Sequence, residues 1–217
     1  MRNFYTAAAL ACAALFPASA QAKQGDLLVR ARAIWVAPTD NASDVLPGFP
    51  GGSVNVENAV VPELDFTYFL TNTIGAELIL ATSPHDLHGT GTLAGLGKVA
   101  DLMALPPTLT LQYHFNPNGR LRPYAGVGVN YTIFYNEDAS SSLTGAVGPT
   151  AVDVDNSFGV AFQLGVDFAL TDRWFLNADV KYIQIDTTAT LNSGGTINTV
   201  DVDLDPVVAG IGVGMRF

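Results

Sequence analysis

The sequence predicts an all-β protein: an eight-stranded antiparallel transmembrane β-barrel with long extracellular loops and short periplasmic turns. Apolar residues recur at every second position in eight segments, and the connections between these segments alternate between short and long. The 217 residues are 48% hydrophobic and 14% charged, with a mean hydropathy of +0.27. No apolar run approaches the about 20 residues that a membrane helix needs. An apolar chain of this kind crosses a bilayer as a closed barrel.

The segment 157–170 shows the alternation without a gap. On a helix its apolar side chains would point in all directions, whereas on a strand they share one face. The segment is longer than the about 5–6 residues of a typical strand and suits a tilted membrane span. Its apolar positions are Phe158, Val160, Phe162, Leu164, Val166, Phe168 and Leu170.

The other seven expected strands carry the same alternation. Five of them lie before 157–170, each with one apolar face. These are 27–36 with Leu27, Val29, Ala31, Ala33 and Trp35; 60–70 with Val60, Leu64, Phe66, Tyr68 and Leu70; 74–80 with Ile74, Ala76, Leu78 and Leu80; 105–115 with Leu105, Leu109, Leu111, Tyr113 and Phe115; and 125–133 with Ala125, Val127, Val129, Tyr131 and Ile133. After 157–170 lie 174–182 and 207–217, with Trp174, Leu176, Ala178, Val180 and Tyr182, and with Val207, Ala209, Ile211, Val213, Met215 and Phe217.

The connections indicate how the barrel is oriented. Three are short and rich in turn residues, near Asn72, at 116–119 and at 171–173. Four are long, at about 39–58, 83–101, 136–155 and 188–200. In outer-membrane barrels the short turns face the periplasm and the long loops face outward. We therefore expect both termini in the periplasm and one domain over 23–217.

The first 22 residues read as a cleaved signal peptide. Arg2 supplies the positive charge, Ala7 to Phe16 the apolar core, and Ala20-Gln21-Ala22 the cleavage site. Without Arg2, nine basic residues remain against 20 acidic ones, a net charge of −11. Such an acidic chain has no electrostatic footprint for nucleic acid. Export and residence in a bacterial outer membrane are the expectation.

The apolar face is expected to point toward lipid. A secreted lipocalin-like barrel would turn it inward instead, but three features favour the membrane. The opposite face is rich in glycine, as at Gly126 and Gly128, and the apolar face carries aromatic residues near its ends, as at Trp35 and Trp174. The chain also ends on Phe217, which resembles the signal read by the outer-membrane assembly machinery.

The inward face divides into two levels. Its lower part is expected to hold a plug of paired charges, because an unpaired buried ion destabilises a fold; the residues are Arg30, Arg32, Asp65, Glu77, Asp167, Asp179 and Lys181. Its upper part becomes apolar and suits a cavity for a hydrophobic molecule; the residues are Ile34, Val36, Val61, Ile79, Phe134, Ile183, Ile185 and Leu204. The alternative is that these apolar side chains pack against loops folded into the lumen.

Prolines mark a candidate lateral exit between strands. Leu105-Pro106-Pro107 lies near the top of the fourth strand, and Pro62 lies near the top of the neighbouring second strand. Proline cannot donate to a β-ladder and is usually excluded from strands that pair on both sides. A gap is expected where these donors are missing, although the prolines are equally consistent with ordinary strand ends.

Several stretches resemble the OmpW family, which includes AlkL-type alkane importers. They include Gly25 to Ala31, Phe66 to Leu78, Leu105 to Leu109, Arg122 to Tyr131, and 185–189 with 202–206 and 212–217. The resemblance implies an eight-stranded barrel that admits small hydrophobic molecules from outside and releases them sideways. Val207 and Met215 depart from the family pattern, and the loops show no clear match, so the substrate does not carry over.

The sequence favours a passive channel and not an enzyme. No Ser, His and acid arrangement has suitable spacing for catalysis, and no cofactor is implied. His85 and His88 read as two solvated loop histidines without a metal. The alternative function is a structural or surface-interaction barrel whose acidic extracellular loops bind host or envelope partners. A separate hypothesis is that these loops share divalent cations with lipopolysaccharide phosphates. Expected partners are outer-membrane lipid, small hydrophobic substrates and the assembly machinery, and the barrel is expected to be a monomer.

Overall fold

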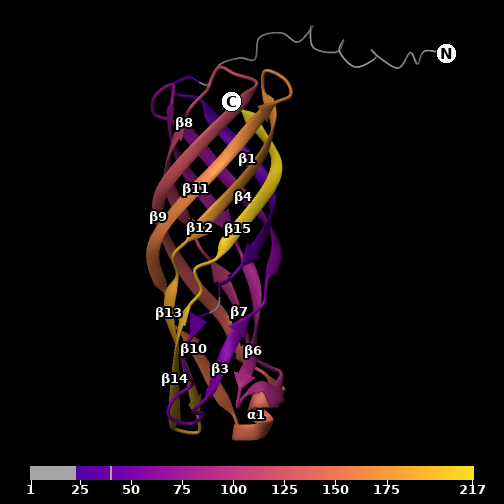
Figure 1. Ribbon diagram of the computed structural model, residues 1–217, viewed down its shortest axis with the longest axis vertical. Helices are drawn as coiled ribbons and strands as arrows, with labels where there is room; N and C mark the ends of the chain where they lie inside the picture. The colour runs from indigo at the N-terminus through magenta and orange to yellow at the C-terminus, as the bar shows by residue number, and fades with distance from the viewer. Residues whose placement is uncertain (1–22, 40) are drawn as a thin grey trace, which may run out of the picture.

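The computed structural model describes residues 23–39 and 41–217, so the expected signal peptide at 1–22 lies outside the described residues. The strands form a tall cylinder, and the described chain ends meet at one end of it, at the top of Figure 1. There the backbone amide of Phe217 donates to the carbonyl of Leu27 at 2.9 Å. No helix in the described part is long and apolar enough to cross a membrane.

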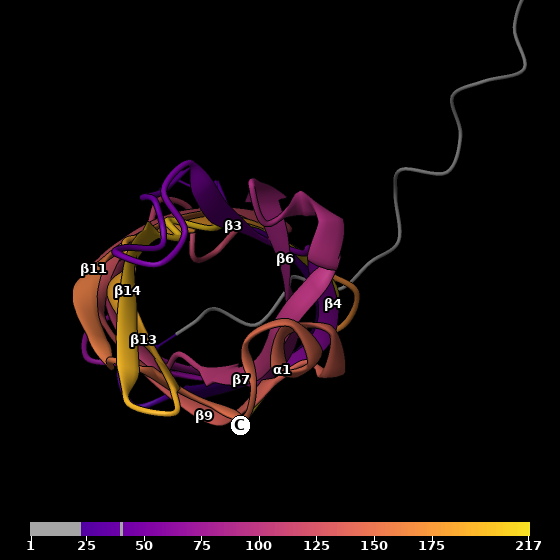
Figure 2. The same ribbon diagram turned by 90° about the horizontal axis from the view of Figure 1, so that it is seen from below.

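Eight strands close the barrel, which confirms the predicted fold class. Each is antiparallel to its neighbours, and the pairing of the first strand with the last completes the ring that Figure 2 shows end-on. In ring order they are β1 (Leu27–Ala37), β4 (Ala59–Phe69), β5 (Ile74–Ala81), β8 (Thr108–His114), β9 (Leu121–Ala139), β11 (Ser157–Ala169), β12 (Trp174–Ile183) and β15 (Val207–Arg216).

The four long connections are folded, and we call them together the extension. It lies at the end opposite the chain termini, at the bottom of Figure 1. We call the end with the chain termini the lower end of the barrel and the end with the extension the upper end, which is the reverse of their places in Figure 1. β9 continues into the extension and pairs there with β7, β7 pairs with β6 and β6 with β3, while β10, β13, β14 and β2 form a separate sheet. The bounds are β2 (Asn41–Ala42), β3 (Gly52–Val56), β6 (Ser83–Gly91), η1 (Ala94–Leu96), β7 (Lys98–Leu105), α1 (Ser141–Val147), β10 (Thr150–Val154), β13 (Asp186–Ser193) and β14 (Thr196–Asp203).

Side chains alternate across the barrel wall as the sequence predicts. β4 alternates between buried and exposed positions along its whole length. Val60 is 74% exposed and Leu164 is 67% exposed on the outside, whereas Arg30 and Asp65 inside are fully buried. The apolar face therefore points outward, toward hydrocarbon, and a lipocalin-like arrangement is excluded.

The expected fourth strand at 105–115 is interrupted, which corrects that prediction. β7 ends at Leu105 and β8 begins at Thr108, because Pro106 and Pro107 have no amide to donate. Below the prolines Ile79 pairs with Thr108, and above them Ser83 pairs with Ala104. Within the described residues no ladder pair joins 80–82 to 105–107. We call this stretch the ladder gap.

Pro62 does not adjoin the ladder gap, contrary to the expectation from the sequence. It lies in β4, pairs with Ala33 of β1, and points outward. The β4–β5 ladder ends just below it, at Glu63 and Ala81. Since β4 and β8 flank β5 on opposite sides, Pro62 and the Pro106–Pro107 pair lie on different sides of one strand.

Two inward glycines allow neighbouring backbones to approach each other closely. A Cβ atom on Gly212 of β15 would collide with the carbonyl oxygen of Ala31 in β1. A Cβ atom on Gly128 of β9 would collide with the carbonyl oxygen of Leu109 in β8. In both cases the obstacle is backbone, so a larger residue forces the strands apart.

We expect Gly212→Ala to lower the free energy of unfolding by about 1–3 kcal/mol, the usual cost of overpacking. Urea unfolding of the barrel in lipid vesicles measures this change. Gly145→Ala is the matched control, because a Cβ atom there meets open space in α1. An equal effect of both substitutions would contradict the role given to Gly212.

Candidate functional site

The lower lumen is filled by ion pairs centred on two arginines of β1. The Arg30 guanidinium lies 2.9 Å from Asp65, 3.3 Å from Glu77 and 3.0 Å from Asp167. Its partners come from β4, β5 and β11, so one side chain ties together four strands. The guanidinium also lies 5.2 Å from the ring centre of Tyr124, a favourable cation–π geometry.

Arg32 and Lys181 form the upper layer of the same network. Arg32 lies 2.8 Å from Glu63, 2.6 Å from Asp65 and 2.7 Å from Asp179. The Lys181 ammonium lies 2.9 Å from both Glu63 and Asp179. Each of the seven residues expected in the plug is buried here. Sequence reasoning omitted Glu63 from the plug, although its inward position on β4 was evident.

The network holds five carboxylates against three cations, namely Glu63, Asp65, Glu77, Asp167 and Asp179 against Arg30, Arg32 and Lys181. Neutral side chains add hydrogen bonds: Thr110 donates to Glu77 at 3.0 Å, and Gln163 donates to Asp179 at 2.9 Å. Ionised groups deprived of water need such partners. The lower lumen is therefore occupied by side chains whose displacement would cost much free energy.

An apolar cluster closes the barrel below this network. Leu28, Phe69 and Phe175 pack together and are almost fully buried. The Phe175 ring lies under Arg30, with 5.5 Å between its centre and the guanidinium carbon. This cluster was not predicted from the sequence, although Phe69 and Phe175 occupy inward positions of their strands.

Above the network lies a cavity with an almost wholly apolar wall. It contains about 930 Å³ of space outside protein atoms when its open part is counted, and about 70 Å³ of this admits the centre of a water molecule. All eight residues expected in the upper lumen line the cavity; seven are buried and Leu204 is half-buried.

The extension continues the cavity wall upward. It contributes apolar side chains at Val56, Leu87, Leu102, Val154, Ala189 and Val202. Ile34 and Phe134 belong to the same buried cluster as these residues. Both alternatives left open by the sequence therefore apply. The upper lumen contains a cavity, and its apolar side chains also pack against the folded connections.

The ladder gap borders the cavity. Ala81, Ser83, Ala104 and Pro106 line the cavity around it, whereas Leu105 and Pro107 are half-buried beside it. Pro62 points outward and is absent from the cavity wall. Of the exit candidates expected from the sequence, Pro106 is the one that reaches the hollow.

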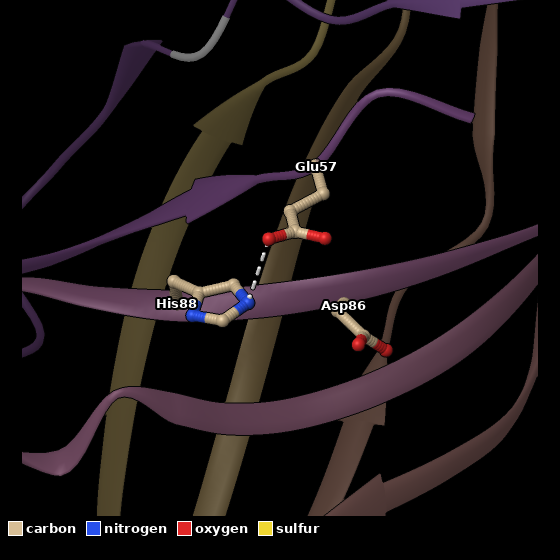
Figure 3. A group of neighbouring side chains, drawn as sticks. All are labelled: Glu57, Asp86 and His88. Atoms are coloured by element: carbon tan, nitrogen blue, oxygen red, sulfur yellow. Dashed lines mark ion pairs between the residues drawn. The ribbon is translucent and has the colours of Figure 1, made fainter.

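In the extension, an exposed Glu57 and half-buried Asp86 and His88 form a small cluster (Figure 3). The Nε2 atom of His88 lies 3.1 Å from Glu57, and their ligand-type atoms and one of Asp86 all lie within 4.8 Å. The Lys98 ammonium lies 2.9 Å from Asp86 and 3.0 Å from Asp101, and these hydrogen bonds raise its pKa. Lys98 pairs with Asp86 and His88 lies against Glu57, so we interpret this cluster as an ion-pair network.

The two histidines expected to be solvated separate in the structure. His88 is part of the cluster with Glu57 and Asp86, but His85 is 8% exposed and lines the cavity. The expectation was wrong for His85, because residues 83–91 form a strand and not a loop. As a strand, β6 turns Ser83, His85 and Leu87 inward together.

Residues 23–217 match the OmpW family. The chain belongs to the OmpW family. Outer membrane protein W of Salmonella typhimurium is 39% identical over 215 residues, covering 98% of this chain and 99% of that protein. Outer membrane protein AlkL of Ectopseudomonas oleovorans is 29% identical over 221 residues, covering 99% and 93%.

A solved structure supports the same assignment. The crystal structure of the outer membrane protein OprG from Pseudomonas aeruginosa has a TM-score of 0.85 and 34% sequence identity, covering 93% of this chain and 99% of that one. This OmpW-family chain is thus an outer-membrane β-barrel, as the sequence predicts. Its relatives are outer-membrane proteins by name.

We expect Arg30→Leu to lower the free energy of unfolding by about 3–5 kcal/mol, because three buried carboxylates lose their shared partner. Urea unfolding in lipid vesicles measures the loss. Arg173→Leu, in an exposed periplasmic-type turn, is the control and should change stability by less than about 0.5 kcal/mol. Equal losses in the two variants would disprove the central role of Arg30.

Proposed function

We propose that this OmpW-family protein is a passive channel for small hydrophobic molecules. The observation that carries the proposal is an apolar cavity stacked directly on a lumen filled with ion pairs. A molecule in the cavity has no path down the axis, because the ionic plug and the apolar cluster below it block the way. The family resemblance, which implies import of hydrophobic molecules, points the same way.

We infer that the extension lies outside the cell and both termini in the periplasm, which puts the cavity on the external side. The long connections at one end of the barrel, and the short turns and chain ends at the other, support this orientation. A substrate enters through the extension, whose apolar side chains line the upper wall. The short turns at the other end join strands closely, as periplasmic turns of such barrels do.

The proposed exit is the ladder gap. Backbone groups without ladder partners are costly against hydrocarbon and are tolerated where they border a cavity. Pro106 lines the cavity, and the residues opposite the prolines, 80–82, lack ladder bonds to them. A hydrophobic molecule leaving here passes directly into the lipid, where its free energy is lowest.

Ile183→Asp should reduce the uptake of an apolar tracer about tenfold or more, because a carboxylate in the cavity removes at least 1.4 kcal/mol of favourable apolar contact. Initial uptake rates in cells expressing equal amounts of folded barrel measure this effect, and Ile34→Asp should act likewise. Ile197→Asp, at an exposed site of β14, is the matched control. Unchanged uptake with a heat-modifiable, folded Ile183→Asp barrel would refute the channel.

The double substitution Pro106→Val with Pro107→Thr should slow uptake several-fold, since residue 107 faces β9 through its carbonyl and the restored amide of residue 106 can donate toward β5 and close the ladder. The tracer assay above measures it, with barrel stability expected to stay equal or rise. Pro62→Val restores an amide on the other side of β5 and should leave uptake unchanged. If Pro62→Val is the slower variant, the exit lies between β4 and β5 instead.

A second function is favoured by the charge of the extension. The connections 38–58, 82–106, 134–156 and 184–206 together contain 13 Asp and Glu residues and one Lys. Among them, burial and the nearby Asp153 raise the pKa of Glu137. Divalent cations shared between such carboxylates and lipopolysaccharide phosphates would anchor the barrel in its leaflet. Replacing the exposed acids by amides separates the two functions, because anchoring should fail while tracer uptake continues.

A further inference from the structure

We propose that the cavity accommodates uncharged apolar molecules that carry one hydroxyl group and disfavours carboxylates of the same length. This inference rests on the proposed channel function and names its substrate class. It is carried by a buried polar pair, Ser83 and His85, in a wall whose other polar residues are Glu63, Thr132, Lys181 and Thr187. Both residues of the pair line the cavity, at 5% and 8% exposure.

The geometry of this pair fixes the direction of its hydrogen bonds. The Nδ1 atom of His85 lies 3.1 Å from the backbone carbonyl oxygen of Glu57. Because a carbonyl oxygen only accepts, Nδ1 carries the ring proton and Nε2 of the neutral ring does not. Nε2 therefore accepts the hydrogen of the Ser83 hydroxyl, whose oxygen lies 2.8 Å away.

Ser83 is thereby left as an acceptor. Its hydrogen is committed to His85, while its oxygen has a second lone pair for another partner. A hydroxyl group in the cavity can donate to that oxygen and so keep a hydrogen bond that it would otherwise lose on leaving water. A ketone offers no donor, and an alkane gains nothing from this site.

Anionic molecules are disfavoured by the charge around the cavity. Its floor is formed by Glu63 and by Lys181, whose ammonium already pairs with Glu63 and Asp179. The network beneath has an excess of carboxylates, and the extension above has 13 acidic residues against one lysine. A carboxylate therefore meets the same sign of charge on both sides and no free donor at Ser83.

The position of Ser83 links this selection to release. The pair of Ser83 with Ala104 is the first ladder pair above the gap. A molecule held by its hydroxyl at Ser83 thus places its apolar tail beside Pro106 and the unpaired stretch. The tail leaves first, and the hydroxyl follows into the polar surface of the membrane.

The test compares saturable uptake of radiolabelled 1-decanol, decane and decanoate by cells that express the protein. Ser83→Ala should raise the half-saturating concentration for decanol about 2- to 10-fold, the value of one hydrogen bond, and leave decane unchanged. Ser83→Thr keeps the hydroxyl and should restore decanol uptake. Ser53→Ala removes a hydroxyl from the extension, where it donates to Ala42, and serves as the matched control.

Other outcomes overturn the inference in distinguishable ways. Equal losses for decanol and decane in Ser83→Ala mean that Ser83 only shapes the wall. In the unmodified protein, decanol should compete with decane better than decanoate does; equal or stronger competition by decanoate refutes the selection without any variant. Uptake of all three compounds that matches cells lacking the protein removes the channel function itself.

Discussion

The structure depends on one constraint, the mutual neutralisation of charges inside a closed wall. Arg30 and Arg32 reach carboxylates on four other strands and draw them toward the barrel axis. These groups are nearly inaccessible to water, so each needs its partners. The same contacts that hold the strands together therefore fill the lower lumen. The hollow above exists because the inward side chains change from ionic to aliphatic along β1, between Arg32 and Ile34.

Strand parity explains how much of this the sequence could predict. Along a barrel strand every second side chain points inward. An inward Arg30 therefore implies that Ile34 and Val36 on the same strand also point inward. Strand parity does not predict the fold of the extension. β6 contains one proline and four glycine or histidine positions, without an alternation of apolar residues along its whole length, and its pairing with β3 depends on contacts far apart in the chain. Such pairings come from tertiary packing and leave little local pattern.

The sequence predicted which residues line the candidate site better than it predicted how they are arranged in space. The two prolines were recognisable as missing donors, whereas their place relative to Pro62 depended on which strands flank β5. Ser83 and His85 are not recognisable as a pair from the sequence. The residue pattern of β6 does not indicate a strand, and a histidine in an irregular segment first suggests a metal ligand or a solvent-exposed side chain. Once β6 is a strand, a spacing of two residues places both on the same face.

The pairing of β6 with β7 begins in the register that β5 and β8 would have reached without interruption: Ile79 opposes Thr108 below, and Ser83 opposes Ala104 above. Ladder pairs thus bound the ladder gap on both sides, and the gap is three residues long. At about 3.3 Å per residue it measures roughly 10 Å along the strand. Its ends are fixed by hydrogen bonds, so an aperture formed there has a built-in upper size. Molecular cross-section, and not only polarity, would then limit what this wall can pass.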